Sequence, residues 1–142
     1  MSRREELGQR LAAVERRIRS ACDSVGRDPG EVTLIVVTKT WPASDVRLLA
    51  ELGVTDVGEN RDQDAAPKSA ACAGLGLRWH FVGQLQTNKV RSVARYADVA
   101  HGIDRARVVD ALSAAATRAR RDVTGLVQVD LGPAGGPPPG GG

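Results

Sequence analysis

The chain has 142 residues, of which 42% are hydrophobic, 26% charged and 3% aromatic. This length fits one ordinary domain, and the apolar fraction is high enough for a packed core, so wholesale disorder is excluded. No stretch approaches the roughly 20 apolar residues that a membrane helix needs. The charged start MSRREELGQR does not resemble a signal peptide. We therefore expect a cytoplasmic protein that makes no membrane contact.

The charges indicate no nucleic-acid partner. The 20 Lys and Arg residues are scattered among 17 Asp and Glu, and few aromatic residues are present to stack on bases. Cys22 and Cys72 lie far apart in the sequence and have no metal-ligand spacing around them. One disulfide is conceivable, but without an export signal we expect two free, partly buried thiols. No metal site is predicted.

Residues 2–25 are predicted to form an amphipathic helix, since apolar residues recur at steps of three and four. Ser2 and Glu5 have the spacing of a capping box, and Gly26 is typical of a helix end. The predicted apolar face holds Leu7, Leu11, Val14, Ile18, Cys22 and Val25.

From residue 32 the pattern changes to short apolar runs that alternate with helical segments. Residues 32–38 are nearly all apolar or β-branched, which is typical of a strand covered on both faces in a parallel sheet. Helices are predicted to begin near Pro42, Asp62, Thr87 and Asp104, with Thr87 and Asp104 as caps. Further strands are predicted at residues 54–58, 79–83, 98–103 and 125–130. This alternation indicates an α/β fold built from β/α units on a parallel sheet.

Functional groups of parallel β/α folds gather at the carboxyl ends of the strands. Lys39 follows the first predicted strand, where loss of hydration would favour the neutral amine that Schiff-base chemistry needs. From position alone, a solvated lysine is the better interpretation. Asn60 either offers its amide to a ligand or tolerates a tight loop, and His80, inside a strand, is typical of a hydrogen-bonded structural histidine. His101 has no catalytic partner nearby in the sequence, so no catalytic residue is predicted.

Three segments in order resemble the pyridoxal phosphate homeostasis proteins, which bind pyridoxal 5′-phosphate (PLP). They are Val-Thr-Lys-Thr at residues 37–40 with Pro42, Gly-Glu-Asn at 58–60, and Trp-His-Phe-Val-Gly-Gln-Leu-Gln-Thr-Asn-Lys at 79–89. The third segment is the most specific. A fourth match joins His101 to residues 103–105, with Gly102 where a hydroxyl residue is usual. The resemblance covers essentially residues 3–131.

The resemblance implies a fold similar to the N-terminal barrel of alanine racemase, with an extra helix at the start. Residues 1–131 would form the N-terminal part of a PLP-binding β/α barrel: a partial (β/α)8 TIM-type barrel of about five parallel strands. Residues 132–142, rich in Gly and Pro, would form a disordered tail.

The resemblance also implies a site and a role. PLP would be held as an aldimine on Lys39, with Asn60 near the cofactor and His80 and Gly83 in the next part of the rim. The protein would hold and deliver PLP in intracellular vitamin B6 homeostasis, without robust catalysis of its own. Its partners would be PLP and PLP-dependent apo-enzymes, and we expect a monomer.

Two departures from the family pattern leave alternatives open. Trp41 stands where many relatives carry a second lysine. The family's glycine- and serine-bearing segments that grip the phosphate would lie beyond residue 142, since phosphate sites of such barrels form after the last strands. One alternative is the first part of an alanine racemase-type PLP enzyme, and another is a non-functional fragment whose sheet cannot close.

Overall fold

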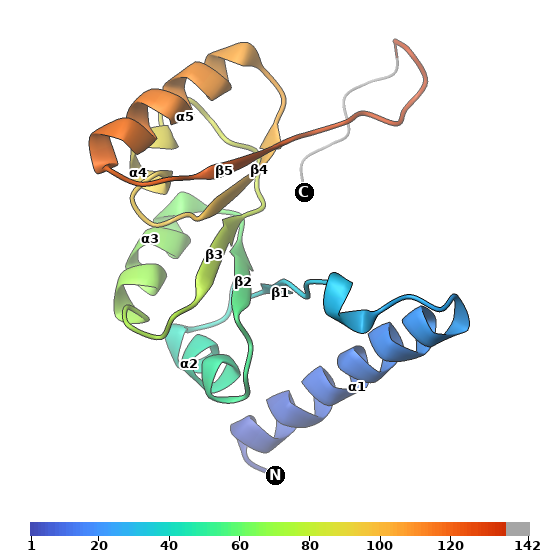
Figure 1. Ribbon diagram of the computed structural model, residues 1–142. Helices are drawn as coiled ribbons and strands as arrows, with labels where there is room; N and C mark the ends of the chain where they lie inside the picture. Colours follow the sequence, from blue (N-terminus) through green and yellow to red (C-terminus); the bar gives the residue numbers. More distant parts are fainter. Residues whose placement is uncertain (136–142) are drawn as a thin grey trace.

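The computed structural model describes residues 1–135 and shows helices and strands in alternation (Figure 1). The five strands form one parallel sheet in the order β1-β2-β3-β4-β5. The predicted α/β fold, with five parallel strands after an N-terminal helix, is therefore confirmed. The elements are α1 (Arg3–Ser24), η1 (Pro29–Glu31), β1 (Val36–Val37), α2 (Ala43–Glu51), β2 (Asp56–Glu59), α3 (Asp62–Ala71), β3 (Arg78–Phe81), α4 (Val90–Val93), β4 (Val99–Ile103), α5 (Ala106–Ala119) and β5 (Thr124–Val127).

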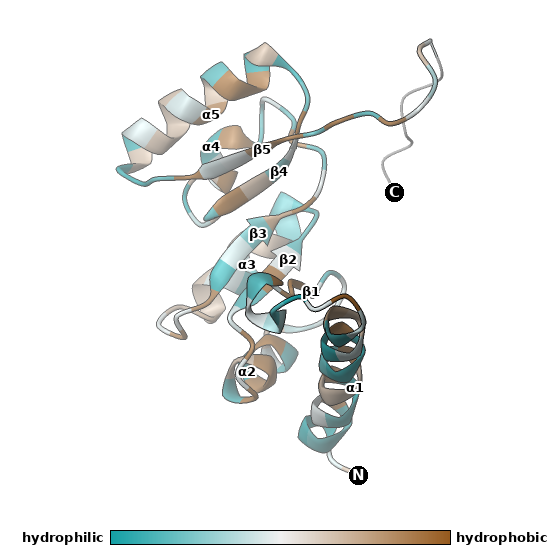
Figure 2. Ribbon diagram, turned by 45° about the vertical axis from the view of Figure 1, so that its right-hand side comes forward, coloured by the Kyte–Doolittle hydropathy of each residue, from teal (hydrophilic) through white to brown (hydrophobic). Residues whose placement is uncertain are grey.

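Helix α1 begins as predicted and contacts α2 near the N-terminus (Figure 1), where Arg3 pairs with Asp45 at 2.6 Å. Ser2 and Glu5 form both hydrogen bonds of the capping box. The predicted apolar face is only partly covered, because Cys22 is buried while Val14 and Val25 are exposed. Figure 2 shows the apolar residues of α1 set in a mostly hydrophilic helix. Helix α1 is therefore a peripheral element of the fold.

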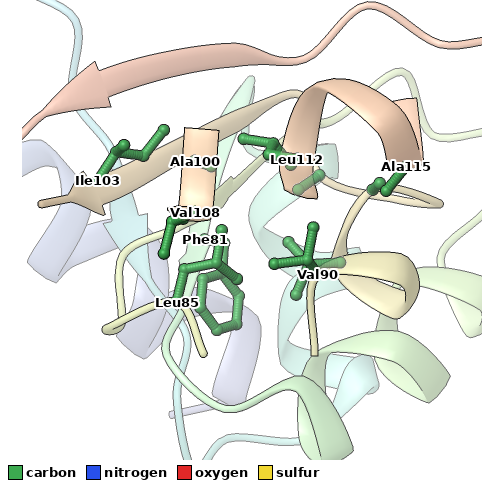
Figure 3. Close-up of a cluster of buried hydrophobic side chains, with 11 residues drawn as sticks. Phe81, Leu85, Val90, Ala100, Ile103, Val108, Leu112 and Ala115 are labelled. Atoms are coloured by element: carbon green, nitrogen blue, oxygen red, sulfur yellow. The ribbon is translucent and has the colours of Figure 1, made fainter. Parts of the chain in front are cut away.

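Helices α2 to α5 cover one side of the sheet with two clusters of buried side chains (Figure 1). The larger cluster joins β3 and β4 to α4 and α5, and Figure 3 shows Phe81 of β3 beside Leu85 and Val108. The smaller cluster joins Val46, Val57, Cys72 and Trp79. Tyr96 packs against both clusters, and its hydroxyl donates to Asp62 Oδ1 over 3.0 Å. Burial, with the nearby charge of Asp62, raises the pKa of Tyr96.

The first predicted strand is much shorter than expected. Strand β1 is limited to Val36 and Val37, which lie opposite Val57 and Gly58, and β2 begins only one residue before Val57, at Asp56. Val37 is 45% exposed, so the interpretation of a strand covered on both faces is wrong for this edge strand.

Two predicted helix caps are also wrong. The N-cap of α4 is Lys89, since Thr87 lies in a turn before the helix. The N-cap of α5 is Arg105, while the carboxylate of Asp104 accepts a hydrogen bond from Arg105 Nε. Neither N-cap side chain bonds to the helix backbone.

Other sequence predictions have mixed outcomes. Cys22 and Cys72 are free and buried, in agreement with the sequence. Every residue of β5, the second edge strand, is exposed. The disordered tail predicted for residues 132–142 falls largely outside the described residues, which end at 135. Within the described residues, no helix is long and apolar enough to cross a membrane.

Arg121 ties the segment between α5 and β5 to the segment that follows α4. Its guanidinium donates to the carbonyls of Ala94 and Ala97 at 2.9 and 3.0 Å. It also donates to the carbonyl of Tyr96 at 3.3 Å and to Asp98 Oδ1 at 2.8 Å. A planar guanidinium satisfies these four acceptors together, which a lysine ammonium cannot do in the same geometry.

Arg121→Lys should lower the free energy of unfolding by about 1–3 kcal/mol, because it leaves partly buried carbonyls without donors. Urea unfolding followed by circular dichroism measures the loss. Arg107→Lys, at an exposed position of α5, is the matched control and should change stability by less than about 0.5 kcal/mol. Equal losses in the two variants would contradict this role of Arg121.

Candidate functional site

The candidate site lies where the strands end. Lys39 and Asn60 follow β1 and β2, Gly83 follows β3, and Gly102 lies near the end of β4. Because all five strands are parallel, their carboxyl ends meet at one edge of the sheet. Thr38 continues the ladder beyond β1, since its amide donates to the carbonyl of Gly58 over 2.8 Å. The predicted residues therefore share one edge.

Lys39 lies in a tight turn that closes when the amide of Trp41 donates to the carbonyl of Thr38 over 3.1 Å. Its neighbour Thr40 has φ +69°, a left-handed conformation that β-branched residues rarely adopt. Such a conformation costs on the order of 1–3 kcal/mol and persists only when the surroundings impose it. Lys39 is exposed, in agreement with the solvated lysine that its position favours, because the turn projects from an edge strand rather than a covered one.

A buried ion pair lies beneath this turn. Lys68 of α3, which is 9% exposed, pairs with Oε1 of Glu59, which is 1% exposed. The Lys68 ammonium also donates to the carbonyl of Thr38 over 2.9 Å, and Thr38 Oγ1 donates to Glu59 Oε1 over 2.9 Å. The other carboxylate oxygen of Glu59 is buried and has no hydrogen-bond partner among the described residues.

The sequence reasoning missed this ion pair, although a signal for it exists. Ala65, Lys68 and Cys72 follow one another at steps of three and four, which places the lysine on the same face as two small apolar residues. All three are buried. A lysine on the covered face of a helix requires a partner, and Glu59 is that partner.

Backbone atoms form the rim between β2 and β4. A Cβ atom on Gly83 would overlap the carbonyl of Asn60, so only glycine fits at this position. Gly102 has φ +67°, and a Cβ atom there would lie 3.3 Å from the carbonyl oxygen of Gly83. The rim thus consists of closely packed backbone at the half-buried Asn60, Gly83 and Gly102, with the side-chain oxygen of Gln128 beside Gly102.

His80 belongs to a hydrogen-bonded chain across three strands. Its Nε2 lies 2.7 Å from Asp56 Oδ1, and its Nδ1 lies 3.0 Å from Nε2 of His101. Thr55 Oγ1 donates to the second oxygen of Asp56 over 2.7 Å. Both ring nitrogens of His80 are therefore engaged within the protein. A cofactor contact of His80 stays a prediction, and it would use the ring carbons rather than a nitrogen.

Protonation within this chain follows from its burial. Burial alone would raise the pKa of Asp56, but hydrogen bonds from His80 and Thr55 outweigh it, so the pKa of Asp56 lies below its ordinary value. Burial, together with the neighbouring His80, lowers the pKa of His101. Within residues 1–135, no group of three or more His, Cys, Asp or Glu side chains is arranged to hold a metal ion.

Folding stability should decrease as the pH falls below about 6.5, the ordinary pKa of histidine. The lowered pKa of His101 means that the unfolded chain binds a proton that the folded chain does not, and one such proton contributes up to about 1.4 kcal/mol per pH unit. His101→Gln keeps a donor for His80 but cannot titrate. Urea unfolding between pH 7 and 5 should show a shallower decline for this variant. Identical slopes would contradict the assignment.

Curated relatives with matching sequences share one name. No family model matches the chain. The pyridoxal phosphate homeostasis protein of Mycobacterium tuberculosis H37Rv is 42% identical over 127 residues, which cover 82% of this chain and 49% of that protein. The protein of the same name in Escherichia coli K12 is 36% identical over 129 residues, covering 89% of this chain and 55% of that protein.

Two solved structures are similar in fold to most of this chain. PipY of Synechococcus elongatus PCC7942, solved with PLP bound, has a TM-score of 0.70 and 32% identity, covering 82% of this chain and 55% of that one. An unknown protein from Bifidobacterium adolescentis has a TM-score of 0.78 and 28% identity, covering 87% of this chain and 55% of that one.

The chain spans about half the length of the curated relatives it matches. The predicted family resemblance is confirmed by sequence identity and by fold over this part. The chain is thus a homologue of the pyridoxal phosphate homeostasis proteins, similar to them over about half of their length.

Proposed function

We propose that this chain binds PLP at the strand-end edge and holds it on Lys39, as part of intracellular PLP homeostasis. The observation that carries the proposal is the exposed amine of Lys39 on a fixed turn, at the same sheet edge as the rim of closely packed backbone. The names of the relatives and the PLP bound to PipY support the choice of ligand.

The residues at this edge fit such a ligand. Lys39 would hold PLP, since its exposed amine is the group to which an aldehyde can be attached covalently. Gly83 and Gly102 add no side chains of their own to this edge, and the half-buried Asn60 offers hydrogen-bonding groups beside Gly83. When bound, PLP supplies an electron sink for carbon chemistry.

The proposed role is that of a carrier rather than an enzyme. PLP enzymes need acid and base groups placed at the reacting carbon, whereas His80 uses both ring nitrogens within the protein. We propose that residues 1–131 form part of a β/α barrel. We also propose that the protein acts in the cytoplasm as a monomer and delivers PLP to PLP-dependent apo-enzymes.

Lys39→Ala should abolish covalent capture of PLP. The chain contains Lys39, Lys68 and Lys89 as its lysines, so borohydride reduction followed by mass spectrometry assigns the labelled amine without ambiguity. The wild-type protein should carry one PLP on Lys39, with a matching absorbance change. Lys89→Ala is the matched control and should load normally. Equal labelling of Lys39→Ala and wild type would overturn the assignment.

Gly83→Ala should weaken PLP loading, because the added methyl group forces the ends of β2 and β3 apart at the carbonyl of Asn60. We expect a loss of about 1–3 kcal/mol in the free energy of unfolding as well. Gly8→Ala in α1 is the control, since its methyl group would make an ordinary 3.5 Å contact with Leu52. That variant should load PLP like the wild type, and parallel titrations compare the two.

A further inference from the structure

We propose that Lys68 is a positioning residue for Lys39: its buried ammonium holds the carbonyl of Thr38 and thereby imposes the turn that presents Lys39 at the strand-end edge. The inference rests on the proposed function of Lys39, and it names two residues, Lys68 and Glu59, that do not themselves contact the ligand.

Every polar atom of Thr38 is hydrogen-bonded within the protein. Its amide donates to the carbonyl of Gly58 over 2.8 Å, and its hydroxyl donates to Glu59 Oε1 over 2.9 Å. Its carbonyl accepts from the amide of Trp41 at 3.1 Å and from Lys68 Nζ at 2.9 Å. Thr38 is 2% exposed, so water does not replace these partners. The residue before Lys39 is therefore held by these four hydrogen bonds.

The turn beyond Thr38 needs such an anchor. Thr40 adopts φ +69°, and a β-branched residue relaxes from this region unless its surroundings hold it there. The Trp41 amide supplies the single backbone bond that closes the turn, from an exposed residue. The hydrogen bond from the Lys68 ammonium to the same carbonyl of Thr38 is, by contrast, buried. Its loss would leave the turn free to relax, and Lys39 would relax with it.

The Lys68–Glu59 pair buries two charges between α3 and the sheet, where uncharged side chains would also pack. Ala65 and Cys72, which lie on the same face of α3, are buried without any charge. Desolvation of an ammonium and a carboxylate makes such a pair a weak source of stability. One carboxylate oxygen of Glu59 accepts hydrogen bonds from both Lys68 and Thr38. The second oxygen has no partner among the described residues. The ion pair is therefore a weak source of stability, whereas its ammonium is placed to hold the carbonyl of Thr38.

The test uses the double variant Lys68→Met with Glu59→Gln. It removes both charges together, so neither is left buried alone, and the amide introduced by Glu59→Gln still offers an oxygen to Thr38. Two measurements are made. Without PLP, amide exchange by NMR reports the Trp41 bond, with the Gly53 amide at the end of α2 as internal reference. With PLP, borohydride trapping reports loading of Lys39.

We expect the amide of Trp41 to exchange at least about tenfold faster, while exchange of the Gly53 amide stays unchanged. Loading of PLP on Lys39 should fall several-fold. Adding Thr40→Gly should restore loading, since glycine holds φ +69° without an external clamp. A purely structural role of the ion pair would not be rescued in this way. Lys89→Met serves as the matched lysine control. If this double variant does not fold, Lys68→Leu with Glu59→Gln replaces it with the same expectations, since it also removes both charges and the donor to Thr38.

The outcomes separate the two proposals. Unchanged exchange at Trp41 overturns the positioning role, whatever PLP does. Wild-type loading on Lys39 that persists in the folded double variant overturns it too, as does a loss that Thr40→Gly fails to rescue. Absence of PLP on Lys39 in the wild type instead refutes the proposed function, while the exchange measurement still decides whether Lys68 fixes the turn.

Discussion

Parallel strand pairing is the constraint on which the rest of this structure depends. It brings the carboxyl ends of five strands to one edge, so residues separated by some twenty positions in the chain become neighbours. It also requires a helix between successive strands, and α2 to α5 all return on the same side of the sheet. The side chains of each strand consequently divide between a helix-facing layer, which holds the apolar clusters, and an opposite face that carries the chain from Asp56 through His80 to His101. The close approach of Gly83 to the carbonyl of Asn60 lies at this same edge of the sheet.

Most of the fold could be predicted because its local signals agree with its tertiary structure. The capping box of Ser2 and Glu5 and the change of period after residue 32 placed the helices and strands correctly to within a few residues. The errors occur where contacts with other parts of the fold determine the local structure. Residues 32–34 have strand-forming sequences, but β2 begins at Asp56 and offers them no partner. Asp104 has the composition of a cap, yet it bonds to the guanidinium of Arg105. Local propensity cannot reveal either outcome.

The candidate site was predictable only in part, and for a similar reason. Lys39, Asn60 and Gly83 could be selected because each follows a predicted strand and lies in a segment that resembles a known family. The solvated state of Lys39 was the better interpretation of its position, and it follows from β1 being an edge strand. The partners of His80 and of Glu59 could not be identified. Asp56 and Lys68 lie 24 and 9 residues away from them in the chain, and only the folded sheet brings each pair within hydrogen-bonding distance.

Tyr96 has a consequence for how this chain loses its structure. Its ring lies against both apolar clusters, and its hydroxyl reaches Asp62 at the start of α3. Neither cluster can open without exposing a face of the same ring to water and breaking a buried contact of the other. The β2–β3 half and the β3–β4 half of the sheet are therefore coupled through one side chain, in addition to sharing β3. The four strand-covering helices belong to a single cooperative unit, whereas α1 has Cys22 as its buried residue and is held to α2 through the Arg3–Asp45 pair.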